Sequence, residues 1–270
     1  MYYFKQVFCF FKEIYQNRRL IYDLSKRDFK ERYVSSYLGI LWAFIQPLVN
    51  VLVFWFVFEV GFRVGLTSSG LPYILWLITG LFPWYFFSDA IVGGTNAIMA
   101  KSFLVKKVVF PVRILPIVPI ISALIINIFF VFLLFVGFLL YGYSPNIYNL
   151  QIIYYTFASV FLVIGLSWVT SSISVFLRDV IPLINMCLQL LFWMTPIFWD
   201  INGVPEKYYL LLKLNPVSYI VDGYRLSFTT QQWFWNDWKS LFCFWLVTII
   251  LIFLGVYIFE KLRPHFADVL

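Results

Sequence analysis

The residues of this chain that could carry chemistry are few, and two of them lie within or beside long apolar segments. These are the acids Glu59 and Asp89. A carboxylate at membrane depth is costly and is therefore a candidate for function. We expect Asp89 to pair with an Arg or Lys, because a proton-coupling role would normally show more than one such acid. The single histidine, His265, lies in the C-terminal tail, so a His-based metal site or proton relay inside the membrane is excluded.

Recognisable catalytic motifs do not emerge from the sequence. No His is placed to act as a base beside a Ser or Cys nucleophile, and no carboxylate pair is set up for glycosyl chemistry. Gly65 and Gly70 have GxxxxG spacing, but Leu71 and Pro72 follow where a phosphate-binding loop needs Lys and Ser or Thr. The three cysteines lie far apart and predict neither a metal site nor a disulfide. We expect no enzyme active site and no cofactor or metal bound by this chain.

Composition indicates a membrane protein. Of the 270 residues, 62% are apolar and 12% are charged, against about a quarter charged in an ordinary soluble domain. A water-soluble globular protein and a disordered chain are both excluded. The net charge of +7 comes from basic residues distributed among hydrophobic spans, so a nucleic-acid partner is not expected. A basic cytoplasmic face is the better interpretation.

Six continuous apolar stretches predict an all-α integral membrane protein with six transmembrane helices, because a membrane barrel needs short alternating segments instead. We expect one transmembrane domain over residues 1–270, with residues 1–37 cytoplasmic or interfacial, spans one to five within 38–199, an outer segment at 200–237, span six within 238–260 and a cytoplasmic tail at 261–270. The predicted spans are 38–60, 71–92, 114–141, 152–177, 180–199 and 241–259.

Charge sets the orientation of these spans. With a cytoplasmic N-terminus, 15 of the 20 Lys and Arg residues fall on the inner side, so we expect both termini to be cytoplasmic. Residues 1–15 carry a helical apolar stripe, which predicts an amphipathic helix either in the membrane surface or against the protein's own cytoplasmic face. The outer segment 200–237 holds apolar runs too short to span, broken at Asn215-Pro216. It predicts two short re-entrant helices between spans five and six.

Several motifs, taken in order, make the chain similar to ABC-2-type permeases that export bacterial polysaccharides such as O-antigen and wall teichoic acid. No one motif is specific, but their order and spacing cover nearly the whole chain. They are Arg27-Asp28-Phe29-Lys30-Glu31-Arg32-Tyr33, Tyr37-Leu38-Gly39-Ile40-Leu41-Trp42, Gln46-Pro47-Leu48, Gly80-Leu81-Phe82-Pro83-Trp84, Phe86-Phe87, Lys106-Lys107-Val108-Val109-Phe110-Pro111, Arg178-Asp179, Thr195-Pro196-Ile197, Asn215-Pro216, Gly223-Tyr224-Arg225 and Arg263-Pro264-His265-Phe266-Ala267-Asp268.

The resemblance implies a half-transporter in the bacterial inner or plasma membrane. Two copies of the chain would form the membrane path as a homodimer, and two copies of a separate ABC ATPase would use ATP and Mg. The implied substrate is a glycan linked to undecaprenyl diphosphate, moved from the cytoplasm to the outer face. The motifs do not separate O-antigen from teichoic acid systems. An exporter of a lipid or drug in the same superfamily, or a membrane-embedded glycosyl- or acyltransferase, is the alternative.

Aromatic side chains are candidates for the substrate path, because rings can stack on the apolar faces of sugars without demanding one hydroxyl pattern. The alternative is that they face lipid or form an interfacial belt. The candidates are Trp42, Phe54, Trp55 and Phe58 in span one, and Phe192, Trp193, Phe198 and Trp199 at the end of span five. Arg27, Lys30 and Arg32, just inside span one, are candidates for binding the lipid diphosphate, or for setting topology and touching anionic lipid.

The resemblance also assigns roles to the inner loops and the outer segment. Contact with the ATPase would involve Lys101, Lys106, Lys107, Phe110, Arg178 and Asp179. Arg178-Asp179 could instead be only an ion pair at a helix end. The residues from Lys207 to Phe228 are similar to the family's paired gate helices, with Tyr208, Asn215, Pro216, Tyr219, Tyr224 and Arg225 as gate candidates.

Overall fold

The computed structural model describes residue 10 and residues 12–34, 39–66, 70–106, 110–200, 204–205, 207, 212 and 214–270. Helices make up 82% of the structure, and the described part contains no strand. The all-α prediction is therefore confirmed. The predicted first re-entrant helix and most of the amphipathic stripe in residues 1–15 fall largely outside the described residues.

Among the described residues, five helical segments are long and apolar enough to cross a membrane. Most of their boundaries lie close to the predicted ones, but the second extends eight residues further, to Ala100, and the last extends ten residues further, to Val269. The segments are Gly39–Gly61 (η1 Gly39–Leu41, α3 Trp42–Trp55, η2 Phe56–Gly61), α4 Tyr73–Ala100, Val112–Leu140 (η3 Val112–Ile114, α6 Ile117–Leu140), Ile147–Ser174 (η4 Ile147–Leu150, α7 Gln151–Ser174) and Trp238–Val269 (α11 Trp238–Leu262, η7 Arg263–His265, α12 Phe266–Val269).

The predicted fifth span is shorter in the structure. Helix α8 (Val180–Met194) ends five residues before the predicted limit at Trp199. The cause is Pro196, since the residue before a proline avoids helical backbone, and Thr195 is extended with ψ 139°. Fifteen residues give only about 22 Å of helix, less than the ~30 Å hydrocarbon core. A sixth span therefore remains a prediction.

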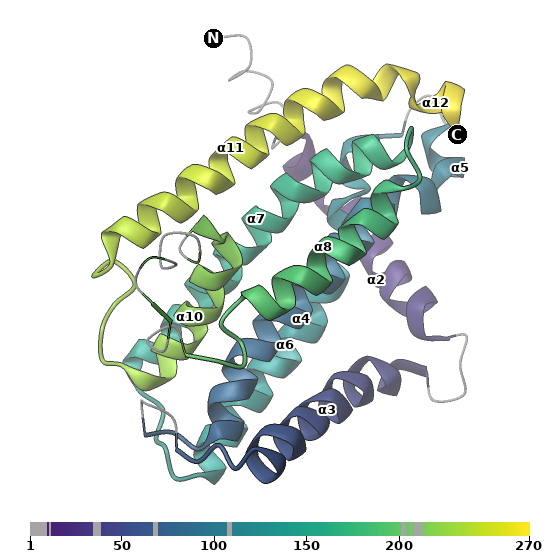
Figure 1. The fold of residues 1–270 in the computed structure, drawn as a ribbon. Coiled ribbons are helices and arrows are strands. Elements are labelled where there is room, and N and C mark those ends of the chain that lie inside the picture. The colour runs from purple at the N-terminus through teal and green to yellow at the C-terminus, as the bar shows by residue number, and fades with distance from the viewer. Residues whose placement is uncertain are drawn as a thin grey trace.

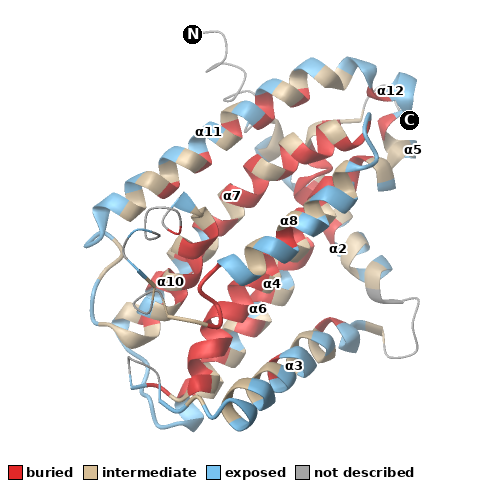
Figure 2. Ribbon diagram, in the orientation of Figure 1, coloured by how far each residue is buried: buried red, intermediate tan, exposed pale blue. Residues whose placement is uncertain are grey.

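Helices α4 and α7 form the centre of the molecule. In the most apolar stretch of α4, 78% of residues are buried, whereas the corresponding value for the segment containing α3 is 11%. Figure 2 shows this contrast, with red concentrated on α4 and α7 and pale blue along α3. Helices α6, α10 (Pro216–Thr229) and α11 pack on the central pair, and α2 (Arg18–Val34) packs on α6.

The two ends of the bundle carry different elements (Figure 1). One end holds α5 (Ser102–Val105), α12 and the turn between α7 and α8. The other end holds α10 and the α6–α7 connection. Segments far apart in the chain are therefore grouped by end, as expected for helices that cross the same slab.

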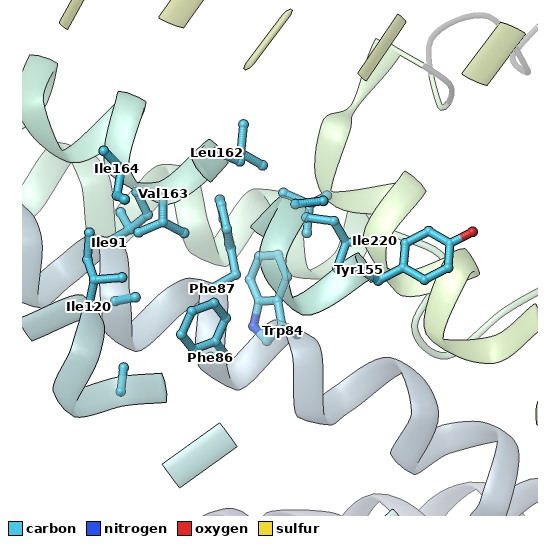
Figure 3. Packing of buried hydrophobic residues seen from close by; sticks show 14 of the residues in the cluster. Trp84, Phe86, Phe87, Ile91, Ile120, Tyr155, Leu162, Val163, Ile164 and Ile220 are labelled. Carbon is cyan, nitrogen blue, oxygen red and sulfur yellow. The ribbon is translucent and has the colours of Figure 1, made fainter. Parts of the chain in front are cut away.

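Close helix packing at one place depends on glycine. A Cβ on Gly255 of α11 would lie 2.8 Å from the carbonyl oxygen of Gly165 on α7, and a Cβ on Gly165 would lie 3.0 Å from the Ile252 nitrogen. Small residues at such crossings allow helix backbones in a membrane to approach and gain dispersion contacts. Beyond this crossing, large apolar side chains fill the core between α4, α6, α7 and α10, including Trp84, Phe87 and Leu162 (Figure 3).

Candidate functional site

Aromatic residues from the two predicted groups meet in one place. We call Phe54, Phe58, Phe192, Trp193 and Phe198 the aromatic cluster. The ring centroids of Phe54 and Phe198 lie 4.7 Å apart, and Phe58 stacks on Phe198 at 5.4 Å. Phe192 and Trp193 approach Phe198 at 5.0 and 5.2 Å. Phe198 is buried whereas Trp193 is 55% exposed, so the cluster leads from the core to the surface.

The other aromatic candidates are placed differently. Trp199 Nε1 donates to the backbone oxygen of Trp193 at 3.1 Å, which keeps it beside the aromatic cluster. Trp55 is partly buried. Trp42 lies at the opposite end of α3 and is 46% exposed. The structure thus brings together five of the eight predicted path residues through direct ring contacts.

A second feature is a cavity of about 440 Å³ among α3, α4, α6 and α8, which we call the amide cavity. Its polar lining includes Gln46 and Asn50 of α3, Asp89 of α4, Asn127 of α6 and Asn185 of α8. Trp42 also lines it. These amides were not among the site residues predicted from the sequence. The available signal was an Asn or Gln within an apolar span, since such a side chain needs a polar partner there.

Several of these amides are exposed on the single chain. Gln46, Asn50, Asn185 and the nearby Gln189 are all exposed on α3 and α8. A carboxamide left without a partner in hydrocarbon costs several kcal/mol. The faces of α3 and α8 that carry them are therefore expected to meet water or protein, not lipid tails.

The predicted pairing of Asp89 with a cation is confirmed. Arg32 Nη1 lies 3.1 and 3.2 Å from the two carboxylate oxygens of Asp89, and Arg32 Nε lies 3.0 Å from Asp28. Lys101 Nζ contacts the other oxygen of Asp28 at 3.2 Å. We call these four residues the Arg32 network. It connects α2 to the polar side of α4 and to the residue just before α5.

The predicted diphosphate residues therefore do not form one group. The Arg32 guanidinium is engaged by two carboxylates, whereas Arg27 and Lys30 are exposed on α2. The other acid, Glu59, lies in η2, and its Oε2 is buried without a hydrogen-bond partner among the residues that the structure describes.

The predicted ATPase-contact residues mostly gather at the end of the bundle that holds α5 and the α7–α8 turn (Figure 1). Lys106, Arg178 and Asp179 are exposed there, and Phe110 is partly buried. Within the described part of the chain, no ion pair joins Arg178 to Asp179, so the geometry does not support the helix-end pairing. Lys107 lies outside the described residues.

A cluster of charged residues around Arg113 was not predicted from the sequence. Arg113 binds Glu260 through Nε at 2.7 Å and Nη2 at 2.9 Å, and Nη1 donates to Glu13. Its guanidinium also lies over the ring of Phe10, which is 1% exposed and packs against Trp168. Phe10 thus packs on the protein itself, but it lies outside the predicted stripe. Of the stripe residues that the structure describes, Ile14 packs on the core whereas Tyr15 is exposed, so both expectations for this helix stay predictions.

At the other end, Arg225 of α10 is fixed by the chain around Pro196. Its Nη1 and Nη2 donate to the carbonyl oxygens of Pro196 and Ile197 at 2.9 and 3.4 Å. Its guanidinium lies 3.6 Å from the ring centroid of Trp76, and Asp222 approaches at 3.5 Å. Burial lowers the pKa of Arg225 to about 10, against the raising effect of nearby Asp222. The side chain is therefore still charged at neutral pH.

The remaining gate candidates divide between capping and core packing. Asn215 is the N-cap of α10, accepting from Val217 N and donating to Thr195 Oγ1 at 3.0 Å, and Pro216 takes the first helical position. Tyr224 is 1% exposed and its hydroxyl lies 2.5 Å from Thr156 Oγ1. The Tyr219 hydroxyl lies 3.1 Å from that of Tyr154.

Tyr208 lies outside the described residues. The gate prediction therefore coincides with a folded helix, α10, that is tied to α4, α7 and the end of α8.

Comparison with known proteins adds independent information. The sequence profile of the family described as "ABC-2 type transporter" matches residues 19–229. The O-antigen export system permease protein RfbA of Klebsiella pneumoniae is 27% identical over 93% of this chain and 95% of its own length. The RfbA protein of Myxococcus xanthus is 28% identical over 95% of this chain and 97% of its own length. The polysialic acid transport protein KpsM of Escherichia coli is 20% identical over 87% of this chain and 90% of its own length.

Proposed function

Since this chain belongs to the ABC-2 type transporter family, we propose that it is the transmembrane subunit of an ATP-driven polysaccharide exporter. The substrate would be a glycan on undecaprenyl diphosphate, moved from the cytoplasm to the outer face of the bacterial inner membrane. A separate ABC ATPase would hydrolyse ATP with Mg. The observation that carries this proposal is the end-to-end match with relatives named as O-antigen export permeases.

The path would be formed by two copies of the chain. The exposed amides on α3 and α8 support this assembly, because a second copy or a water-filled passage would supply the partners that lipid cannot. The low burial of the segment containing α3 points to the same surface. In this arrangement the amide cavity of each copy would open to the shared path, with six spans per copy and both termini cytoplasmic.

Within the path, the aromatic cluster would provide stacking surfaces for sugar rings. Trp193 and Phe192 lie on α8 and Phe54 and Phe58 on the facing α3 segment, so the cluster joins two helices of the proposed path. Stacking tolerates many hydroxyl patterns, which suits a polymer that must slide. We expect alanine at both Trp193 and Trp199 to slow glycan export while the complex with the ATPase still assembles.

At the cytoplasmic side, Arg27 and Lys30 would bind the lipid diphosphate. Both are exposed on α2, and phosphate oxygens accept charge-assisted hydrogen bonds from such groups. Arg32 would instead act as a positioning residue, because its guanidinium is held by Asp28 and Asp89. This assignment narrows the diphosphate site from three residues to two.

The ATPase would act on the end of the bundle that carries α5 and the α7–α8 turn. The exposed Lys106, Arg178 and Asp179 offer charged contacts there. Lys101 connects this end to α2 through Asp28. At the opposite end, α10 and the segment before it would close the path between transport events.

The test is affinity purification of the chain from its native host in mild detergent, with the mass of the complex and its ATPase activity recorded. A complex of two copies with two ATPase subunits is expected. A chain that purifies alone, without ATPase activity even after crosslinking in intact cells, would instead favour the membrane-embedded transferase. A deletion strain that still exports its glycan would contradict the proposed substrate.

A further inference from the structure

The amide cavity contains a buried acceptor that the protein leaves without a hydrogen bond. Asn127 of α6 lines this cavity and is 1% exposed. Its Nδ2 donates to the Tyr224 hydroxyl at 3.4 Å, whereas its Oδ1 has no hydrogen-bond partner among the residues that the structure describes. Buried polar atoms almost always have a partner, in the protein, in water or in a ligand. Asn127 Oδ1 therefore indicates that an occupant of the cavity supplies a donor.

Two further carboxamides line the cavity without an internal partner. Gln46 of α3 and Asn185 of α8 make no side-chain hydrogen bond within the described part of the chain. Each carboxamide carries two N–H donors and one carbonyl acceptor, and a half-turn of the amide exchanges their positions. Such groups suit a ligand whose polar groups both donate and accept hydrogen bonds.

Aromatic surface lies beside these amides. Trp42 lines the cavity together with Tyr85 and Phe86, and it is 46% exposed. Among the described residues, no other aromatic ring contacts Trp42, so its exposed surface is not taken up by a neighbouring ring. The cavity therefore offers an apolar ring surface next to groups that donate and accept hydrogen bonds.

Hydrogen-bond chemistry separates the candidate occupants. A lipid chain could cover the rings, but it would leave Asn127 Oδ1 without a donor, which is unfavourable for a buried polar atom. An anion would bring acceptors instead of donors, and Arg32 beside the cavity is already held by Asp28 and Asp89. A sugar ring offers hydroxyl donors around its edge and an apolar face. The cavity volume of about 440 Å³ is also within the ~300–1,000 Å³ of small-molecule sites.

We propose that the amide cavity is a subsite for an uncharged sugar ring, one hydroxyl of which donates to Asn127 Oδ1. The inference rests on the proposed export function and deepens it, because it names the group by which the path holds the glycan. Gln46 and Asn185 would exchange hydrogen bonds with neighbouring hydroxyls, and Trp42 would cover an apolar face of the ring. Because carboxamides can turn to donate or accept, this subsite tolerates more than one hydroxyl pattern.

The experiment is calorimetric titration of the full chain in lipid nanodiscs, with empty nanodiscs as the reference. The two probes are maltotriose and permethylated maltotriose, which keeps the sugar rings but has no hydroxyl donor. We expect wild-type protein to bind maltotriose at least about tenfold more tightly, because the methylated probe leaves buried acceptors unpaired.

Asn127→Leu keeps the approximate size of the side chain and removes the acceptor. It should weaken maltotriose binding about three- to tenfold and change binding of the methylated probe little. Without sugar, its unfolding midpoint should stay close to that of wild type, because the Tyr224 hydroxyl keeps its contact with Thr156. Asn236→Leu removes an exposed carboxamide that does not line the amide cavity. It is the matched control and should leave both affinities unchanged.

Three results would overturn the proposal. Absence of maltotriose binding would mean that the cavity holds only water, and equal or tighter binding of the methylated probe would mean that it takes an apolar occupant. A maltotriose affinity of Asn127→Leu within twofold of wild type would remove Asn127 from the subsite. The wild-type comparison of the two probes needs no variant, so misfolding of Asn127→Leu does not remove the test.

Glycan export by the deletion strain is measured separately, so that the two proposals can fail independently. Loss of export in that strain without a preference for maltotriose refutes only the subsite. A preference for maltotriose without any role in export refutes only the proposed function.

Discussion

Replacing Arg32 with Ala tests whether the Arg32 network holds α2 against α4. The substitution removes contacts of 3.0 Å to Asp28 and of 3.1 and 3.2 Å to Asp89, leaving two carboxylates near each other without the guanidinium. Breaking a fully buried ion pair costs about 3–5 kcal/mol. The side chains of Arg32 and Asp89 are 24% and 45% exposed, so water screens their interaction in part. We therefore expect Arg32→Ala to lower the unfolding free energy by about 1–3 kcal/mol.

The corresponding change at Asp89 should cost less. In Asp89→Ala, Arg32 still binds Asp28, so the expected loss is about 1 kcal/mol. The double variant should be less destabilised than the sum of the single variants, with a coupling energy of about 1–2 kcal/mol. Lys30→Ala, exposed on the same helix, is the control and should change stability little.

The assay is thermal unfolding in nanodiscs, followed by tryptophan fluorescence. One kcal/mol should shift the midpoint by roughly 2–4 °C for a chain of this size. Additive single effects, within about 0.5 kcal/mol, would show that Arg32 and Asp89 do not interact and would refute the reasoning. A Lys30→Ala midpoint that falls as far as that of Arg32→Ala would show a general effect of charge on α2.

Gly255→Ala should lower the unfolding midpoint and the yield, because the new Cβ would lie 2.8 Å from the Gly165 carbonyl oxygen. The control Gly137→Ala meets nothing nearer than 3.6 Å and should change neither quantity. An equal fall of the unfolding midpoint in both variants would show that the close crossing of α7 and α11 is not the cause. The double variant Gln46→Leu with Asn185→Leu should reduce glycan export at least about tenfold without loss of stability. The reason is that apolar groups would replace hydrogen-bonding amides in the amide cavity. Normal export would show that these amides lie outside the path. Arg27→Ala with Lys30→Ala should lower export without changing the unfolding midpoint, and unchanged export would remove both residues from the diphosphate site.

The sequence by itself determined the membrane class and the approximate helix boundaries. Continuous apolar runs of about 20 residues can be satisfied in lipid only as helices, so segments such as 114–141 were predicted almost to the residue. The break predicted at Asn215-Pro216 is likewise local chemistry, since Asn215 caps α10 and Pro216 takes its first helical position. The motif order identified the family, which the profile match bears out.

Tertiary structure alone decided which of these residues act together. Arg32 and Asp89 are 57 positions apart and meet only because α2 packs on α6, which in turn packs against α4. Phe198 joins Phe54 because α8 ends at Met194 and the chain then turns back. The amide cavity likewise forms between several helices. A hydropathy profile does not encode how these helices are placed relative to one another. Hydropathy reports each residue's preference for lipid or water, whereas these contacts depend on the rotation and crossing of whole helices, which are fixed by side-chain packing between distant segments.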